Sequence, residues 1–237
     1  MVAAVGAAAC AIGFFDDGYG RSNDVEVSEA FSFQEEVAGL VRLEIEGING
    51  SVAITGDASA AEARIEGRRR VRSSSRSDAR DFLDRVTVEV VRVVDALVVR
   101  TRQPGDTGGR ELLVEYEVVI PADLRVEILL VNGVVDVSGM KGDLEARVVN
   151  GELLASHSLP AGGEADMTLV NGILRLDVPA STSAMLEADV VNGTIGVVGL
   201  TLEEATTSAR SVRGRLGDGD GRIDLQVTNG TITVRGR

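Results

Sequence analysis

Aromatic residues are scarce in this chain of 237 residues, which has no tryptophan, two tyrosines and five phenylalanines. Ligand clefts are usually lined by large apolar and aromatic side chains, so the scarcity counts against an enzyme cleft or a sugar-binding groove. There is also a single histidine, His157, which any Ser-His-Asp triad or histidine-based metal site would have to use. Since its neighbours are Ser156 and Ser158, we expect His157 to lie in a solvent-exposed loop without a catalytic partner.

The chain has no sequence motif for a phosphate, zinc or serine-nucleophile site. The run Gly217-Asp218-Gly219-Asp220-Gly221 is similar to part of a calcium loop. However, Arg222 follows where an EF-hand loop carries its third oxygen ligand, and a calcium β-roll needs tandem copies. We therefore predict a glycine-rich turn at residues 217–221 in preference to a calcium site, and no metal, cofactor or catalytic residue.

A single cysteine, Cys10, excludes an internal disulfide. Cys10 lies in an apolar leader at residues 1–15, which is too short to span a bilayer comfortably. The residues Ala7-Ala8-Ala9-Cys10 resemble a lipoprotein signal, and Ala7-x-Ala9 resembles an ordinary export cleavage site, although a basic n-region is missing. We expect an exported protein of the cell envelope, periplasm or exterior, with membrane attachment through lipidated Cys10 as a hypothesis. The alternative is a buried N-terminal element with an inert thiol.

The net charge of −13 argues against nucleic-acid binding. Residues 62–110 are the exception, because they hold 12 arginines against 8 acidic residues. They contain the only basic cluster, formed by Arg68, Arg69, Arg70, Arg72, Arg76 and Arg80. We interpret this cluster as a solvated strand end and helix face, with an anionic partner such as a phospholipid surface as the alternative.

Six Asn-Gly pairs recur along the chain and are its most informative feature. They are Asn49-Gly50, Asn132-Gly133, Asn150-Gly151, Asn171-Gly172, Asn192-Gly193 and Asn229-Gly230. From the second pair onward the spacings are 18, 21, 21 and 37 residues, and the last divides in two if Val212-Arg213-Gly214 is a decayed copy. A period near 20 indicates one small structural unit that is repeated.

Apolar and polar residues alternate on both sides of each pair. Val126, Ile128 and Leu130 precede the pair at 132–133, for example, and Val135 and Val137 follow it. Alternation with period 2 predicts half-buried strands. Asn-Gly favours a two-residue turn with positive φ at both residues, so the unit is predicted to be strand, tight corner, strand. The corners of Asn150, Asn171 and Asn192 are expected to stack into a ladder of side-chain amides, which is a structural role.

The V-N-G corners, together with the run from Tyr116 to Pro121 and the segment 43–54, resemble a bacterial family of unknown function called “putative adhesins”, which are built of β-strand repeats. The resemblance covers about residues 40–237. It implies a β-solenoid rather than free hairpins, and it offers no catalytic residues.

We therefore predict an all-β, solenoid-like stack of repeats of about 20 residues. Residues 1–15 form the leader, 16–30 a polar tether, and 31–237 a single β-repeat domain that is less regular over 31–122 and regular over 123–237. One short helix is expected at residues 78–85, capped by Ser77. Its apolar stripe consists of Ala79, Phe82, Leu83 and Val86.

The function that fits these features is a non-enzymatic surface or envelope protein that presents strand faces to an unknown surface ligand or envelope partner. One alternative is a structural or regulatory envelope protein without an external receptor. A more distant one is a solenoid carbohydrate-active enzyme. Its nearest candidate carboxylates, Asp136 and Asp177, occupy different positions of the repeat.

Overall fold

The structure is a computed structural model that describes residues 23–237. The predicted leader, Cys10 and the first part of the predicted tether lie outside this range. The described chain forms thirteen strands and one helix, which confirms the all-β prediction.

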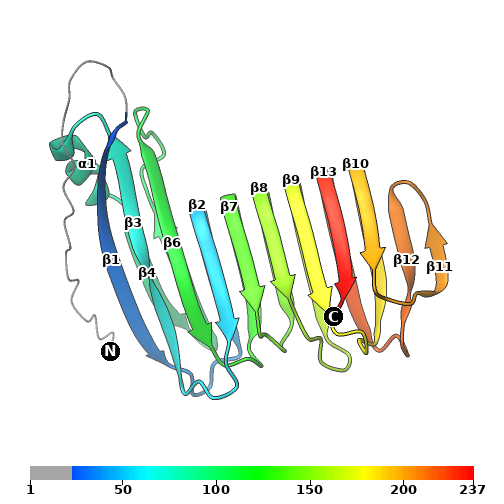
Figure 1. Cartoon of the computed structure of the whole chain (residues 1–237). Helices are drawn as coiled ribbons and strands as arrows, with labels where there is room; N and C mark the ends of the chain where they lie inside the picture. The colour runs from blue at the N-terminus through cyan, green and yellow to red at the C-terminus, as the bar shows by residue number, and fades with distance from the viewer. Residues whose placement is uncertain (1–22) are drawn as a thin grey trace.

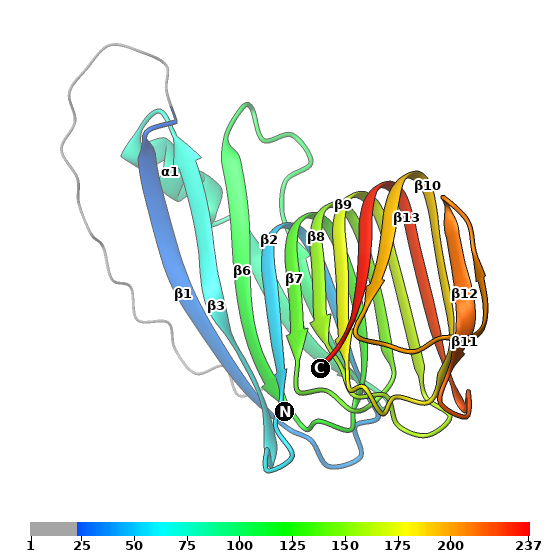
Figure 2. The same ribbon diagram turned by 45° about the vertical axis from the view of Figure 1, so that its right-hand side comes forward.

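Six long bent strands form the regular part of the molecule, and each is called a rung here. The rungs are β2 (Arg42–Gly56), β7 (Arg125–Ser138), β8 (Leu144–Ser156), β9 (Glu164–Val178), β10 (Ala184–Val198) and β13 (Gly221–Gly236). Each rung arches over at its Asn-Gly corner, so a first arm before the corner faces a second arm after it (Figure 2). Neighbouring rungs pair in parallel, Asn opposite Asn and Gly opposite Gly. The result is a β-solenoid-like stack, as the family resemblance implies.

The core lies between the two layers of arms. Leu130 and Val135 are five residues apart and would face opposite sides of a flat strand, yet both are buried, because the corner lies between them. In the other rungs the same two positions hold leucine, valine or isoleucine, except that Gly47 stands before the corner of β2. The interior is therefore a set of aliphatic rows, each continued from rung to rung.

The corner differs from the predicted hairpin turn. Gly133, Gly151 and Gly172 have φ values of 140°, 140° and 139°, whereas no asparagine in residues 23–237 has positive φ. The prediction of positive φ at both residues is wrong because the two arms do not pair with each other. Each arm instead pairs with the adjacent rungs, so the asparagine stays in the strand and the glycine alone makes the bend.

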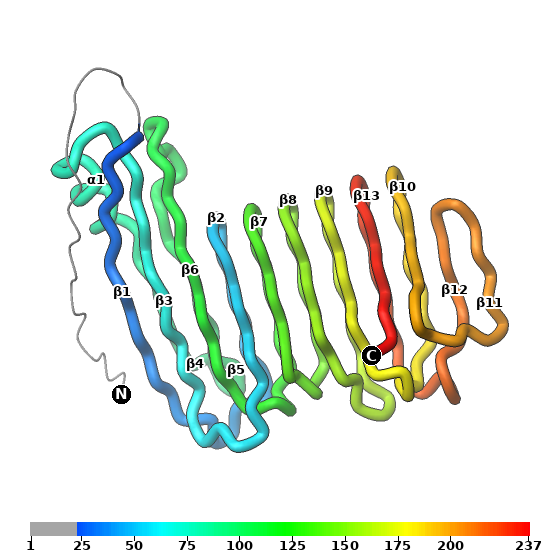
Figure 3. The backbone as a smooth tube through the Cα atoms, in the orientation of Figure 1, coloured from blue at the N-terminus to red at the C-terminus, as the bar shows by residue number. Residues whose placement is uncertain are grey.

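The asparagine side chains stack along the outside of the corners. Each Nδ2 donates to the Oδ1 of the neighbouring rung, in the order Asn132 to Asn49 (2.7 Å), Asn150 to Asn132 (2.8 Å), Asn171 to Asn150 (2.7 Å), Asn229 to Asn171 (2.8 Å) and Asn192 to Asn229 (2.9 Å). Asn192 thus binds Asn229 and not Asn171. The reason is the order of the rungs, β2-β7-β8-β9-β13-β10, in which the C-terminal strand β13 lies between β9 and β10 (Figure 3).

A hairpin extends the sheet of first arms beyond β10. It consists of β11 (Glu203–Thr207) and β12 (Ser211–Leu216), and β12 pairs antiparallel with the first arm of β10. The interpretation of Val212-Arg213-Gly214 as a decayed corner is wrong, since these residues lie within β12. The hairpin therefore pairs with the edge of the first arm of β10 and does not form another rung.

The opposite end of the stack is built from wider connections. Its elements are β1 (Val25–Glu36), β3 (Glu62–Ser73), α1 (Arg76–Leu83), β4 (Thr87–Val93), β5 (Ala96–Arg102) and β6 (Glu111–Ile120). β5 pairs in parallel with the first arm of β2, and β6 with its second arm. The loop 103–110 therefore connects β5 to β6 where a rung would have an Asn-Gly corner. The segment that contains α1 connects β3 to β4 in the same way. As a consequence, β6 rises above the arch of β2 (Figures 1 and 2).

Two sequence-based boundaries at this end need correction. The helix spans Arg76–Leu83, and its N-cap is Ser75, whose side chain accepts a hydrogen bond from the Asp78 amide, rather than Ser77. The predicted apolar stripe of α1 is buried. The polar tether predicted over 16–30 is wrong from Val25 onward, because β1 begins there and pairs antiparallel with β3.

We predict that Gly151→Ala strongly destabilises the fold. A Cβ at Gly151 would lie 1.8 Å from the carbonyl oxygen of Gly133, and its φ of +140° disfavours any L side chain. The expected loss in free energy of unfolding, measured with urea, exceeds about 3 kcal/mol.

The matched control is Gly196→Ala on the second arm of β10, where an added methyl group would meet nothing within 4 Å beyond its own chain neighbours. This variant should change stability by less than about 1 kcal/mol. Equal losses for the two variants would contradict the role assigned to the corner glycine.

Candidate functional site

An acidic residue stands five positions before the asparagine in every rung. Because the rungs pair in register, the six carboxylates form one row across the outer face of the first arms, called the acidic row here. In spatial order it is Glu44, Glu127, Glu145, Asp166, Asp224 and Glu187. Adjacent strands lie about 4.8 Å apart, a spacing at which like charges repel. The row therefore requires compensating cations.

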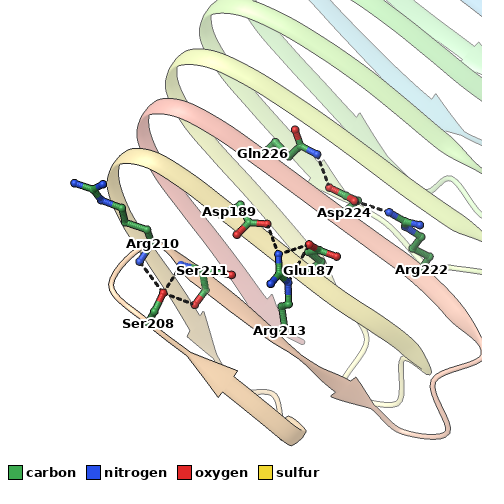
Figure 4. A network of polar contacts seen from close by, with 9 residues as sticks. All are labelled: Glu187, Asp189, Ser208, Arg210, Ser211, Arg213, Arg222, Asp224 and Gln226. Carbon is green, nitrogen blue, oxygen red and sulfur yellow. Dashed lines mark hydrogen bonds and ion pairs between the residues drawn. The ribbon is translucent and has the colours of Figure 1, made fainter.

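Arginines on the same face supply most of that compensation. Arg125 bridges two rungs, with its Nε 2.7 Å from Glu127 and its Nη2 2.8 Å from Glu145. Similar pairs join Arg42 to Glu44 at 2.6 Å, Arg222 to Asp224 at 2.8 Å, and Arg213 to Glu187 at 2.5 Å. Figure 4 shows the last two pairs, with Arg213 reaching across from β12 to Glu187 and Asp189 on β10.

Asp166 is the member of the acidic row that has no ion pair within residues 23–237. Burial raises the pKa of the Asp166 carboxyl, and the adjacent charge of Asp224 raises it further, while Arg147 opposes the shift. Asp166 borders a hollow of about 130 Å³, which is lined by Arg125, Asp143, Leu144, Glu145, Arg147, Glu164 and Asp166. A cationic group placed there would meet a carboxylate that is not already committed to an arginine.

Three of the six arginines of the predicted basic cluster form cross-strand ion pairs, whereas Arg68, Arg76 and Arg80 are exposed. Arg69 lies 2.5 Å from Glu29, Arg70 lies 3.1 Å from Glu115, and Arg72 lies 2.8 Å from Glu26. These arginines on β3 join it to β1 and β6. Their position favours a structural role in the sheet over a binding site for an anionic partner.

Residues 217–221 form the predicted turn between β12 and β13. Gly217 and Gly219 have positive φ, and the Asp220 carboxylate accepts a hydrogen bond from the Ser183 hydroxyl at 3.1 Å. Within residues 23–237, no group of three or more His, Cys, Asp or Glu side chains is placed to hold a metal ion. Asp136 and Asp177 lie on β7 and β9, with β8 between them, so they do not form a pair.

Residues 122–235 match the family described as Toastrack DUF4097. The Toastrack match covers five of the six rungs and confirms the predicted family of unknown function, over a shorter range than residues 40–237. Rung β2 and the wider end of the molecule lie outside it. A search of curated proteins finds no match.

One solved structure shares this architecture. A protein described as a putative cell adhesion protein from Clostridium sporogenes aligns with a TM-score of 0.59 and 11% identity, over 89% of this chain and 100% of that one. At this identity the likeness establishes the fold alone. A putative adhesin from Bacteroides fragilis (6% identity, 90% and 98% coverage) and a putative lipid binding protein from Parabacteroides distasonis (7%, 88% and 96%) each reach a TM-score of 0.24, which is too low to support an argument.

No helix within residues 23–237 has the length and apolarity needed to cross a membrane.

His157 is buried just beyond the end of β8, whereas the sequence predicts that it lies in an exposed loop. Its side chain has 0% exposure, and neither ring nitrogen has a hydrogen-bond partner. The backbone explains the difference, because the amide of His157 donates to the carbonyl of Asp177 and the amide of Ser158 donates to that of Met140. These bonds turn the end of β8 inward. The flanking serines gave no signal of this burial.

The buried imidazole is held in its neutral form. Burial lowers the pKa of His157 to about 4 from 6.5, and the nearby positive charge of Arg237 lowers it further, while Asp143 opposes the shift. A histidine whose pKa is lower in the folded state contributes stability that is complete above pH 6.5. That stability is lost as the pH falls from 6.5 towards 4.

We predict that His157→Leu makes the fold less sensitive to acid. Between pH 7.5 and 4.5 the imidazole should cost the wild type about 2 kcal/mol of unfolding free energy, and the leucine variant should not show this part of the loss. Urea unfolding at both pH values measures the difference. If both proteins lose the same amount, His157 is not the buried neutral group described here.

Proposed function

We propose that this chain is a non-enzymatic, exported surface protein that binds a partner through the acidic row on its first arms. The observation that carries the proposal is the row itself, in which six rungs present a carboxylate at the same height on one rigid face. A partner that bears cationic groups would complement it. Preorganised charge of one sign favours encounter with such a partner and selects against others.

The partner would make its strongest contact in the hollow beside Asp166. Most carboxylates of the row already form an ion pair with an arginine. Replacing one surface ion pair by another yields little free energy. Asp166 lacks such a partner, and its raised pKa reflects burial beside Asp224 and Glu145. A cation delivered by the partner would relieve that repulsion, so binding at Asp166 gains more than binding at the paired positions.

The fold supports this proposal only in general terms. A structure with the same architecture is described as a putative cell adhesion protein, and architecture alone does not determine function. The regular spacing of the rungs adds a physical argument. Because the rungs repeat in register, the sheet face offers several equivalent contacts to a large surface.

We predict that Glu164→Gln combined with Asp166→Asn weakens binding. The probe is an array of glycans and matrix proteins, with the protein applied at about 10 μM. To each spot that binds the wild type, the variant should bind at least fivefold more weakly. Raising the salt concentration should also weaken wild-type binding, because salt screens exposed charges. The matched control is Glu152→Gln with Asp136→Asn, which removes the same charge from exposed positions on the second arms.

Equal weakening by both double variants would show that net charge matters and the acidic row does not. Absence of wild-type binding to every spot would count against the surface-binding role itself and favour an envelope protein without an external receptor.

Attachment to a membrane is a separate proposal that rests on Cys10, which lies outside the described residues. Small residues before a lone cysteine fit lipid modification of its thiol. Because the chain has one cysteine, the test is unambiguous. Radiolabelled palmitate should label the full chain expressed in bacteria and should not label Cys10→Ser. A wild-type protein that takes up no label would remove the anchor.

A further inference from the structure

A groove lies where the tall end of the molecule meets the regular rungs. β6 rises above the arch of β2 because the loop 103–110 replaces a two-residue corner (Figure 2). The groove lies between this loop and the first two Asn-Gly corners, and its volume is about 520 Å³. That volume is within the range of roughly 300–1,000 Å³ that is typical of ligand pockets.

One wall of the groove is a strand edge with a single partner. Residues 111–113 of β6 pair with Arg70, Val71 and Arg72 of β3, whereas β2 pairs with β6 only from Val114 onward. Glu111, Leu112 and Leu113 all line the groove. Within residues 23–237 no strand lies on their other side. The backbone groups on this edge are therefore available to a further extended chain.

The floor of the groove holds the free end of the asparagine ladder. Every ladder bond points the same way, so Asn49 accepts from Asn132 through Oδ1 and its own Nδ2 has no acceptor within residues 23–237. Chains of aligned amide hydrogen bonds polarise one another, which strengthens the terminal donor. This donor lies beside Gly50, which also lines the groove.

The charges around the groove are already paired. The Arg110 guanidinium binds both oxygens of Asp78, at 2.6 Å and 2.5 Å, and stacks 3.8 Å from the centre of the Phe82 ring. Glu111 lies 3.6 Å from Arg72. These pairs leave no unopposed charge for an ionic ligand. They favour an uncharged occupant that supplies hydrogen-bond acceptors.

The loop that forms the other wall is held in place before any ligand arrives. Asn23 donates to the carbonyl of Gly109 at 2.7 Å, the Gly108 amide donates to Asp106 at 2.8 Å, and the Arg110 amide donates to Thr107 at 3.1 Å. Binding would therefore require little ordering of the protein.

We propose that this groove binds an extended, uncharged peptide segment of a partner protein by strand addition to residues 111–113 of β6. Backbone hydrogen bonds to a free strand edge are the common means of recognising an extended peptide. The free Nδ2 of Asn49 would donate to a carbonyl oxygen of the bound segment, in the place that another rung would occupy. This inference does not depend on the acidic row, which lies on a different face.

The test uses the blocked peptide acetyl-Thr-Val-Asn-Val-Thr-amide and ¹⁵N-labelled protein. At millimolar peptide, the amide resonances of residues 111–113 and the side-chain resonance of Asn49 should shift. A peptide of the same sequence with N-methylated backbone amides keeps the side chains and cannot pair as a strand. It should produce no such shifts, and this comparison uses the wild-type protein throughout.

Asn49→Asp is the sharpest variant, because a carboxylate still accepts the hydrogen bond from Asn132, while the free donor is lost and one negative charge is added. It should weaken peptide binding about fivefold, the effect of one hydrogen bond. Asn192→Asp at the far end of the ladder controls for the added charge, although it also removes the hydrogen bond from Asn192 to Asn229, and it should leave binding unchanged. The proposal is overturned if residues 111–113 do not respond, if the N-methylated peptide binds equally well, or if Asn49→Asp binds like the wild type.

Discussion

The close approach of glycine backbones at the corners is the constraint on which the rest of the structure depends. A Cβ on any of the six corner glycines would lie 1.7–1.9 Å from a carbonyl oxygen of an adjacent strand. Glycine is therefore required there for space as well as for its backbone conformation. The position before the asparagine is much freer, since isoleucine, valine and threonine all occur there. This constraint fixes the pairing register between neighbouring rungs. Because of that register, equivalent residues of successive rungs line up in rows.

Rows have opposite consequences inside and outside the stack. Inside, identical aliphatic positions pack on one another, and a row of leucine and valine side chains is a continuous core. Outside, the same alignment brings six carboxylates together, and repulsion must be offset. The arginines do this from several directions: Arg125 spans two rungs, and Arg213 reaches over from the terminal hairpin. Asp166, in the middle of the row, has two acidic neighbours in register and is the one member of the acidic row without an ion pair within residues 23–237.

Local patterns predicted the rungs well, and the arrangement of the rungs poorly. Alternation and Asn-Gly pairs identified the strands because both act within a few residues. The position of β13 between β9 and β10 could not be predicted in this way. The repeat copies are alike, and no residue within one copy specifies which other copy pairs with it. His157 was missed for a related reason. Its burial depends on backbone bonds to Met140 and Asp177, which are distant in sequence, while its immediate neighbours are polar. The acidic row was visible as isolated glutamates and aspartates, and only the register made it a row.

The two ends of the stack differ chemically because the asparagine ladder has a direction. At the β10 end the last free group is the Oδ1 of Asn192, an acceptor, and the second arm of β10 has no further strand beside it within residues 23–237. Val191 and Val198 are 56% and 60% exposed there. At the β2 end the free group is the Nδ2 of Asn49, which is a donor. It faces the groove wall formed by β6 instead of open solvent, because the longer connections place β6 above the corner of β2. A donor, a strand edge and a preformed loop coincide only at that end. The asymmetry follows from repeating one polar side chain in one orientation, and it makes the two ends of a repetitive molecule chemically different.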